Sequence, residues 1–252
     1  MKPNNTKPTG DNGYIAGRNS VTELLRSGRA VDRIVVERGR TGGSMTPIIA
    51  MAAERGIPVK EASGEKLSAM CPGANHQGVV AVAAMKEYCT VDDILATAAE
   101  RGEEPFIVIC DEIEDPHNLG AIIRTAEICG VHGVIIPKRR SVGLGFAVAK
   151  AACGALEYMN VARVTNIATE MDRLKKQGVW IYAADMDGQD SRAVDYSGAV
   201  ALVIGSEGKG VGRLVKEKCD TIVSLPMKGK ITSLNASVAA GVLMYDVMRS
   251  RA

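Results

Sequence analysis

The sequence predicts an α/β protein of two domains, of which the second and larger contains a parallel β-sheet. From residue 106 onward, continuously apolar runs alternate with helical patterns, and apolar strands bounded by helices indicate a parallel sheet covered on both faces. Before it, from Tyr14 to residue 84, helical patterns alternate with shorter β-rich runs, which indicates a compact α/β domain of its own. A chain of 252 residues has the usual length of two such domains.

The composition is that of a globular protein without membrane spans or disulfides. Hydrophobic residues make up 46% of the chain and charged residues 24%. No apolar run approaches the ~18 residues that cross a bilayer, and the N-terminal residues contain no apolar core of a signal peptide. The 6 cysteines form no C-x-x-C pair and the 3 histidines are scattered, so no metal site is expected. We therefore expect a cytoplasmic protein with reduced cysteines.

The net charge of +2 is unevenly distributed along the chain. Residues 1–83 contain 11 Lys+Arg and 7 Asp+Glu, a net charge of +4, whereas residues 84–252 contain 20 and 22, a net charge of −2. The first domain is the more basic one. This excess suits a polyanionic partner, although solvated charged faces produce the same pattern.

The first domain is expected to span residues 14–84. Residues 1–13 before it lack periodicity and are rich in Asn, Pro, Thr and Gly, which predicts a flexible tail. Within the domain, the patterns predict helices at 20–27, 47–55 and 63–69 and strands at 33–37, 58–61 and 78–84. Residues 85–104 are rich in charge and alanine, and we expect a linker there that contains a short helix at 91–101.

The second domain is expected to span residues 105–252. Its predicted strands lie at 106–110, 133–137, 159–164, 179–184, 199–205 and 221–226. Its predicted helices lie at 121–129, 145–153, 167–177, 211–216 and 235–249. Ligands of such folds bind beyond the carboxyl ends of the strands, so the loops after these strands are the candidates for a site.

The first candidate loop, residues 111–127, follows the strand at 106–110. Asp111, Glu112, Glu114 and Asp115 at its start suit a divalent cation, but turn and helix-cap roles for Asp115 and Asn118 around Pro116 explain the pattern better. Arg124 lies on a largely apolar helical segment. Its guanidinium either makes a buried ion pair or presents its planar fork to a phosphate or carboxylate, and the sequence leaves both open.

The second candidate loop, residues 204–212, contains glycines that let a backbone approach a ligand closely. It fits neither the G-x-G-x-x-G dinucleotide pattern nor the Walker pattern. Glu207 is its one acidic residue, and a solvated turn or a helix cap would explain it equally well. A basic run at residues 138–140 also follows a strand; it is a solvated loop or a contact to phosphates.

The third candidate loop joins the strand at 221–226 to the last helix, and Ser233, Leu234 and Asn235 lie where the helix begins. Ser and Asn are good N-cap residues, since their oxygens accept from free N–H groups of the first turn. No Glu or Gln stands three residues after Ser233 or Asn235, so a capping box is missing. These side chains therefore cap a helix or hold a ligand.

The three loops together resemble the sequence motifs of the SpoU (TrmH-like) family of RNA ribose 2′-O-methyltransferases. The motifs are NLGAIIRTAE at 118–127, LVIGSEGKGV at 202–211 and LPMKGKITSLNASVA at 225–239, in the family's order and spacing. GRNSVTELLRSG at 17–28 and NHQGVVAVAA at 75–84 resemble the small ribosomal-protein-like RNA-binding domain of the family's ribosomal RNA branch.

The resemblance implies a SPOUT domain with a deep trefoil knot, a homodimer and S-adenosyl-L-methionine as the cofactor. By position in the motifs, it implies that the cofactor is contacted by Gly205, Leu225, Met227, Gly229, Ser233 and Leu234. The active site that it implies consists of Asn118, Arg124, Glu207, Ser233 and Asn235. Arg124 is the family's candidate for aligning or deprotonating the 2′-OH, but a guanidinium keeps its proton in proteins and so suits positioning better than proton abstraction.

The function implied is methyl transfer to a ribose 2′-OH of RNA, and the domain layout favours a guanosine of large-subunit (23S) ribosomal RNA. Transfer RNA, or a ribosomal adenosine whose methylation gives antibiotic resistance, are alternative targets within the same chemistry. A non-catalytic RNA-binding assembly factor that keeps the knot is the alternative from another class. The expected partners are thus RNA and a second copy of the chain, with no membrane and no metal.

Overall fold

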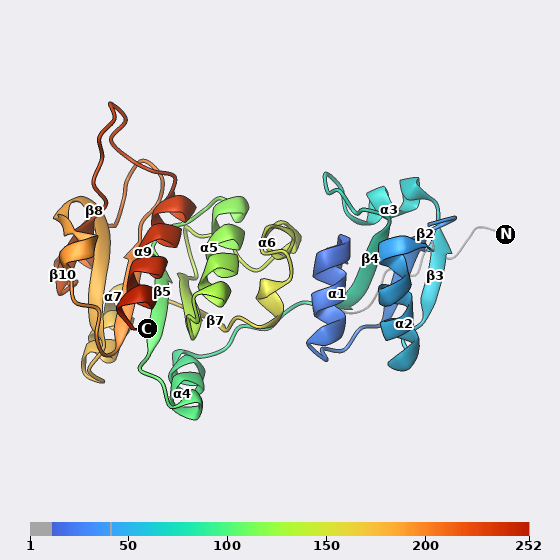
Figure 1. Cartoon of the computed structure of the whole chain (residues 1–252), viewed down its shortest axis with the longest axis horizontal. Coiled ribbons are helices and arrows are strands. Elements are labelled where there is room, and N and C mark those ends of the chain that lie inside the picture. The colour runs from blue at the N-terminus through green and yellow to red at the C-terminus, as the bar shows by residue number, and fades with distance from the viewer. Residues whose placement is uncertain (1–11, 41, 252) are drawn as a thin grey trace. The chain divides into compact units, whose positions relative to one another are not determined.

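The computed structural model describes residues 12–40 and 42–251, and the chain divides into two compact units. The first unit ends at Glu87 and also takes in Leu144–Glu157, whereas the second holds Tyr88–Gly143 and the chain from Tyr158 onward. Figure 1 labels most of the helices and strands of both units. The first unit is therefore discontinuous in sequence, because a segment between two strands of the second unit belongs to it.

The first unit is built on a four-stranded sheet in the described residues, with strand order β1-β4-β2-β3. Its strands are β1 (Asn12–Ala16), β2 (Arg33–Glu37), β3 (Val59–Ala62) and β4 (Val79–Ala84). Its helices are α1 (Arg18–Arg26), α2 (Thr46–Glu54), α3 (Gly64–Met70) and α6 (Phe146–Ala151), with 3₁₀ turns at Gly43–Met45 and Ala155–Glu157. β4 pairs antiparallel with β1 and β2, while β2 and β3 are parallel.

One strand of this sheet, β1, was not predicted. Residues 1–11 of the expected tail lie outside the described residues, but Asn12 and Gly13 begin β1. β1 is an edge strand whose buried Ile15 and Ala16 face the core beside β4, and so short an apolar signal is lost among the polar residues before it. β2 has the predicted bounds, since its central residues form an uninterrupted apolar run.

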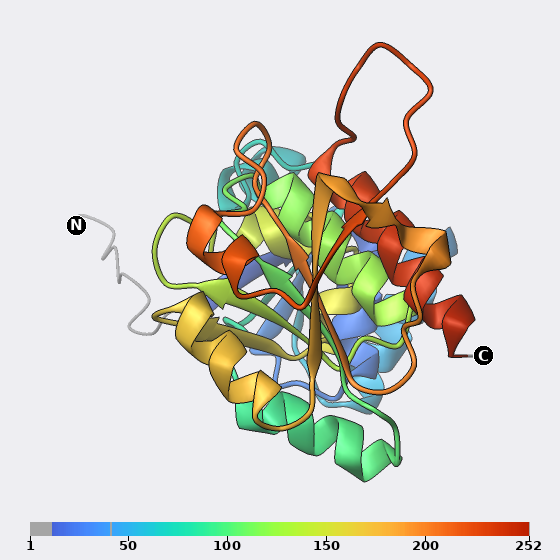
Figure 2. The same ribbon diagram turned by 90° about the vertical axis from the view of Figure 1, so that its left-hand side faces the viewer.

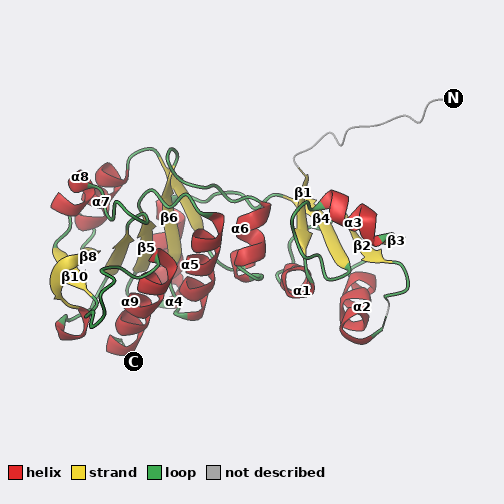
Figure 3. Ribbon diagram, turned by 90° about the horizontal axis from the view of Figure 1, so that it is seen from above, coloured by secondary structure: helices red, strands yellow, loops and turns green. Residues whose placement is uncertain are grey.

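The second unit contains a six-stranded parallel sheet in the described residues, with strand order β10-β8-β9-β5-β6-β7. The strands are β5 (Phe106–Cys110), β6 (Gly133–Pro137), β7 (Val161–Val164), β8 (Trp180–Asp190), β9 (Val200–Ile204) and β10 (Thr221–Ser224). The helices are α4 (Val91–Arg101), α5 (Pro116–Ile128), α7 (Ile167–Lys175), α8 (Arg213–Glu217) and α9 (Ala236–Ser250), with a 3₁₀ turn at Ser191–Ala193. Every residue of β5 and β9 is buried, so the prediction of a parallel sheet covered on both faces is confirmed (Figure 3).

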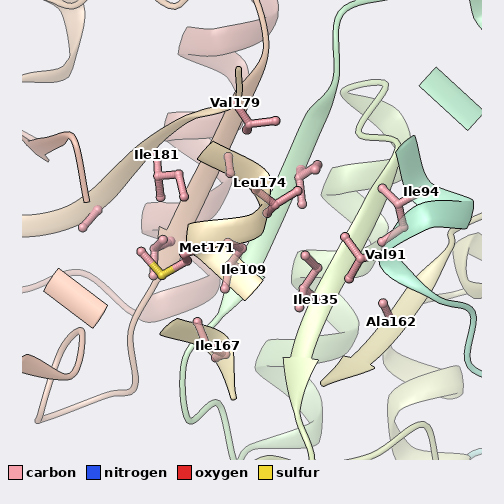
Figure 4. Packing of buried hydrophobic residues seen from close by; sticks show 14 of the residues in the cluster. Val91, Ile94, Ile109, Ile135, Ala162, Ile167, Met171, Leu174, Val179 and Ile181 are labelled. Atoms are coloured by element: carbon pink, nitrogen blue, oxygen red, sulfur yellow. The ribbon is translucent and has the colours of Figure 1, made fainter. Parts of the chain in front are cut away.

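The core on one face of this sheet is formed with α4 and α7. Figure 4 shows Val91 and Ile94 of α4 and Met171 and Leu174 of α7 pointing toward the strands, and these side chains are almost fully buried. In a second layer of helices, α5 and α9 pack against each other. Because α4 contributes to this core, the helix expected inside a linker at residues 85–104 is an integral part of the second unit.

The strand β8 is longer than predicted and leaves its ladder with β10. Tyr182 and Ala183 pair with Thr221 and Ile222, but the next residue of β10, Val223, pairs with Gln189. Residues 184–188 are therefore passed over, which makes a bulge of the kind that redirects side chains. The prediction that the strand ends at residue 184 reflects the end of its apolar run and not of its backbone pairing.

The last helix, α9, exposes an apolar stripe. Val238, Val242 and Tyr245 lie at i, i+4 and i+7, so they share one face of the helix, and each is at least partly exposed. Ala240, Leu243, Met244 and Val247 on the opposite side are buried. Among the described helices, none combines the length and hydropathy needed to cross a membrane.

Candidate functional site

Side chains from three separate loops meet beyond the carboxyl ends of β5, β9 and β10. Asn118 Nδ2 donates to Glu207 Oε1 over 3.0 Å, and Asn235 Nδ2 donates to Asn118 Oδ1 over 2.9 Å. Asn235 Nδ2 also donates to Glu207 Oε1. The three residues, which the sequence places 89 and 28 positions apart, thus form one closed hydrogen-bonded group, the Asn118–Glu207–Asn235 junction.

Asn118 is placed by the start of α5, which lies earlier than predicted. The Asp115 side chain accepts from the His117 N–H, and Pro116 occupies the first helical turn, so this sequence begins a helix at residue 116. The predicted cap role of Asp115 is confirmed. Asn118 is consequently a residue of the first turn; it is only 6% exposed, and its amide is directed at Glu207.

Asn235 caps a helix, which is one of the two roles that the sequence left open, and it also joins the junction. Its Oδ1 accepts from the N–H groups of Ser237 and Val238 over 3.0 and 3.3 Å, so it is the N-cap of α9. Its Nδ2 faces the other way, toward Asn118 and Glu207. The cap therefore fixes the orientation in which the amide meets the junction. Ser233 is exposed in the loop before the helix and does not cap it.

The loop that carries Glu207 is a tight backbone hairpin. The N–H of Ser206 donates to the carbonyl of Gly210 and the N–H of Gly210 donates back, over 3.1 and 2.9 Å. A Cβ at Gly205 would lie closer than 3.0 Å to the backbone of Gly210 and Val211. Only glycine fits at residue 205, and its backbone is left bare at the edge of the cavity described next.

A cavity of about 770 Å³ lies between these loops. The loop before α9 forms one wall, and Figure 2 shows this segment as a long loop extending away from the sheet. Of the residues that the motifs singled out, the cavity is lined by Gly205, Glu207, Leu225, Met227, Ser233, Leu234 and Asn235. Gly229 lies in the same loop but is not a lining residue.

Arg124 lies apart from this lining. It is an exposed residue of α5, two turns after Asn118. Because the residue is exposed, a buried ion pair, one of the two alternatives left by the sequence, is excluded. Arg124 remains a candidate site residue because it lies on α5, the helix that carries Asn118.

The acidic residues after β5 have structural partners. The buried Asp111 accepts the N–H of Gly212 over 2.8 Å; burial raises the pKa of its carboxyl, although this hydrogen bond works against the rise. Glu112 forms an ion pair with Arg140 over 2.9 Å, within the basic run after β6. In the part of the chain that the structure describes, no group of three or more His, Cys, Asp or Glu residues could hold a metal ion.

Sequence reasoning missed one charged pair in the cavity wall. Asp185 lies in the bulge of β8, and its Oδ2 is 2.8 Å from Nζ of Lys216. Burial alone would raise the pKa of Asp185, but hydrogen bonds from Lys216 and from backbone N–H groups outweigh it and hold this pKa below its usual value. The polar run after residue 184 follows an apolar strand, which is the same signal that identified the other loops.

Two family models match the chain. The model of the SpoU rRNA Methylase family matches residues 105–245, and a model described as RNA 2'-O ribose methyltransferase substrate binding matches residues 14–89. YacO of Bacillus subtilis (strain 168), assigned to the TrmH family of tRNA/rRNA methyltransferases, is 50% identical over 94% of this chain and 96% of its own length.

Solved structures show the same fold. The SpoU methyltransferase AviRb from Streptomyces viridochromogenes, in complex with AdoMet, superposes with a TM-score of 0.79 at 24% identity, over 96% of this chain and 91% of AviRb. An AdoMet-bound rRNA methyltransferase from Sinorhizobium meliloti superposes with a TM-score of 0.77 at 25% identity, over 95% of this chain and 87% of its own.

Proposed function

The chain belongs to the SpoU rRNA methylase family, and from this premise we propose that it transfers a methyl group from S-adenosyl-L-methionine to a ribose 2′-OH of RNA. The observation that carries the proposal is the Asn118–Glu207–Asn235 junction. Its members come from the three segments that match the family's motifs, and two of them, Glu207 and Asn235, line the cavity.

The cavity suits the cofactor. Its volume of about 770 Å³ lies within the ≈ 300–1,000 Å³ of small-molecule sites. Leu225, Leu234 and Leu243 supply apolar walls, and Gly205 forms part of the lining between them. We assign cofactor contacts to Gly205, Leu225, Met227, Ser233 and Leu234 and to neighbouring Gly229. When bound, S-adenosyl-L-methionine supplies a methyl group that its positively charged sulfur activates toward a nucleophile.

The residues of the junction would hold the ribose. Two amides fix the Glu207 carboxylate, which is therefore oriented before a ligand arrives, and Ser233 adds a hydroxyl at the same rim. Arg124 would present its guanidinium fork to a phosphate or to the developing charge at the 2′-oxygen. Its exposure on α5 supports positioning, since a guanidinium keeps its proton in proteins and is a poor base.

RNA binding is proposed for the first unit, with a contribution from the second. The first unit matches the substrate-binding model and lies in the part of the chain with a net charge of +4. In the second unit, the ion pair with Glu112 holds Arg140 in the loop after β6, next to exposed Lys138 and Arg139. We propose a guanosine of 23S ribosomal RNA as the target, in the cytoplasm; the tRNA/rRNA description of YacO keeps transfer RNA as the alternative.

The trefoil knot and the homodimer belong to the same proposal. The position of β9 between β5 and β8 requires the chain to return into a sheet already begun, which supports threading. The exposed apolar stripe of α9 supports a second copy of the chain as the surface that covers it. In such a dimer, each site would lie close to the α5 and α9 helices. Val242→Glu would convert the dimer to a monomer in light scattering after gel filtration, whereas Leu214→Glu, on an exposed position of α8, would leave the mass unchanged. A Val242→Glu protein of unchanged mass contradicts the dimer.

The proposed function is tested with Arg124→Ala. Methyl transfer to RNA from cells lacking the protein should fall by at least about 100-fold, the scale of a lost transition-state contact. Binding of S-adenosylhomocysteine should persist, because Arg124 lies outside the cavity lining. Arg213→Ala is the control, since this side chain is 91% exposed on α8. Unchanged turnover in Arg124→Ala excludes a catalytic role.

The target is tested in cells. Maps of 2′-O-methylated nucleotides in total RNA, with and without the protein, should differ at one position. Loss of methylation at a ribosomal guanosine supports the proposed target, and loss at a tRNA position would make tRNA the substrate. Identical maps would contradict methyl transfer to RNA altogether.

A further inference from the structure

The bulge of β8 delivers side chains to the cavity that none of the motifs contain. Between Ala183 and Gln189 the strand abandons its pairing with β10 and turns outward, and residues 184–187 line the cavity. Two of these residues, Asp185 and Asp187, are acidic. They are so close in sequence that they form a natural comparison.

The return of the bulge to the sheet is fixed by Gly188. A Cβ at this residue would lie 2.6 Å from the backbone of Ile222 and Val223, so only glycine permits the approach. The Ser224 hydroxyl donates to the carbonyl of Gly188 over 2.8 Å and holds the crossing in place. The bulge is therefore specifically supported rather than a loose loop, and the direction of Asp185 is set by the backbone.

The two acids differ in environment. The Asp185 side chain is 19% exposed and is held by Lys216, whereas that of Asp187 is 81% exposed and 4.0 Å from the same amine. Asp185 also lies against the tight hairpin of the Glu207 loop, 3.9 Å from the Cβ position of Gly210. It is thus a preorganised, ionised carboxylate in the cavity wall, and Lys216 occupies only part of its capacity to accept hydrogen bonds.

The cofactor offers three kinds of donor: the ammonium of its methionine part, the vicinal hydroxyls of its ribose and the exocyclic amine of its adenine. The ammonium of the cofactor is disfavoured as the partner of Asp185, because the charged amine of Lys216 beside this carboxylate would repel a second cation. A neutral pair of hydroxyls suffers no such repulsion, and carboxylates that follow a strand of a parallel sheet hold ribose hydroxyls in other nucleotide sites. The Glu207 carboxylate is already engaged by two amides.

We propose that Asp185, held by Lys216, binds the ribose hydroxyls of the cofactor and so selects for its nucleoside part. This inference rests on the proposed function, because it assumes that S-adenosyl-L-methionine occupies the cavity. Asp185 is then a binding residue that the bulge of β8 adds to those supplied by the three motif loops.

The test measures binding of S-adenosylhomocysteine to the full chain by calorimetry. Asp185→Asn should weaken binding by about 10- to 100-fold, the loss expected for hydrogen bonds to a charged acceptor. Asp92→Asn is the control, with the same substitution on a side chain of α4 that is 69% exposed and outside the cavity lining, and should bind within about twofold of the wild type. Thermal melts check that both variants are folded.

The ligand is then varied in the same way. The 2′-deoxy and 3′-deoxy forms of S-adenosylhomocysteine should bind the wild type more weakly, and Asp185→Asn should cost little further affinity for the form that lacks the bound hydroxyl. If Asp185→Asn weakened the binding of all three ligands equally, Asp185 would contact another group of the cofactor, and the inference would be overturned. Full affinity of the variant for S-adenosylhomocysteine would also overturn it. If Asp185→Asn fails to fold, undiminished binding of both deoxy forms to the wild type overturns it.

Failure of the proposed function gives a different result. In that case the wild type itself does not bind S-adenosylhomocysteine, and neither substitution matters. Binding by the wild type with no effect of Asp185→Asn leaves the methyltransferase proposal intact and removes only the role of Asp185.

Discussion

The two roles of Asn235 can be separated by two substitutions at the same residue. Asn235→Ala removes both the cap of α9 and the amide that meets Asn118 and Glu207. Asn235→Ser removes only the amide, because serine caps helices about as well as asparagine. The pair therefore distinguishes what the residue does for the helix from what it does for the site.

The magnitudes follow from the contacts. Loss of the cap, whose Oδ1 accepts from two N–H groups, costs about 1 kcal/mol of unfolding free energy, within a range of about 0.5–2. The hydrogen bonds of Nδ2 add about 1 kcal/mol, because Glu207 is exposed and water replaces part of the loss. We expect Asn235→Ala to lose about 2 kcal/mol and Asn235→Ser about 1 kcal/mol, or about 4–8 °C and 2–4 °C in melting temperature.

Two assays are needed. Melting followed by circular dichroism gives the stability, and transfer of a labelled methyl group to RNA gives the activity. Both variants should lose methyl transfer to a similar degree, since both lack the amide, while only Asn235→Ala suffers the larger drop in melting temperature. Equal melting temperatures refute the capping role, and full activity in Asn235→Ser refutes the role of the amide in the junction.

Two further predictions concern a glycine and a histidine. Gly205→Ala should abolish S-adenosylhomocysteine binding, because its Cβ would overlap the backbone of Gly210, whereas Gly42→Ala, with nothing within 4 Å, should bind normally; retained binding by Gly205→Ala contradicts the tight hairpin. Burial lowers the pKa of His132, which is 2% exposed and accepts the Phe106 N–H at Nδ1 over 2.9 Å, so the unfolded chain binds its proton more readily. The free energy of unfolding should therefore be constant above about pH 6.5, the pKa of an unperturbed histidine. It should fall as the pH drops from there toward the lower pKa of the folded state. His132→Asn, which keeps an acceptor for Phe106, should flatten this slope in urea titrations at pH 5 to 7; an unchanged slope assigns it elsewhere.

Much of the second unit could be predicted because the central strands of its sheet are buried. β5 and β6 have the predicted bounds, since every residue of an inner parallel strand is apolar and the run ends where the strand ends. The start of α5 was predicted five residues late, at 121 instead of 116, because its first turn is polar. The cap and proline at its start are local signals that could have found it.

The meeting of the three loops could also be predicted, whereas the bulge could not. Asn118, Glu207 and Asn235 follow strands of one parallel sheet, and the carboxyl ends of such strands share an edge. Asp185 reaches the cavity because Gly188 crosses the backbone of β10. The contact between Gly188 and β10 joins residues that no periodicity of the sequence relates. The apolar run ends at residue 184, so the pattern does not predict the course of the bulge after it.

The place of β9 between β5 and β8 also bears on how the chain acquires its fold. Val200 pairs with Phe106, so the central pair of the sheet joins residues almost a hundred positions apart. Pairings of such long range are slow, because the entropy of closing the loop is lost before the contacts form. During synthesis, β5 leaves the ribosome long before β9 exists, and the backbone edge that β9 later pairs with stays open. We expect the second unit to refold slowly and to require dilute conditions or a chaperone that shields this edge.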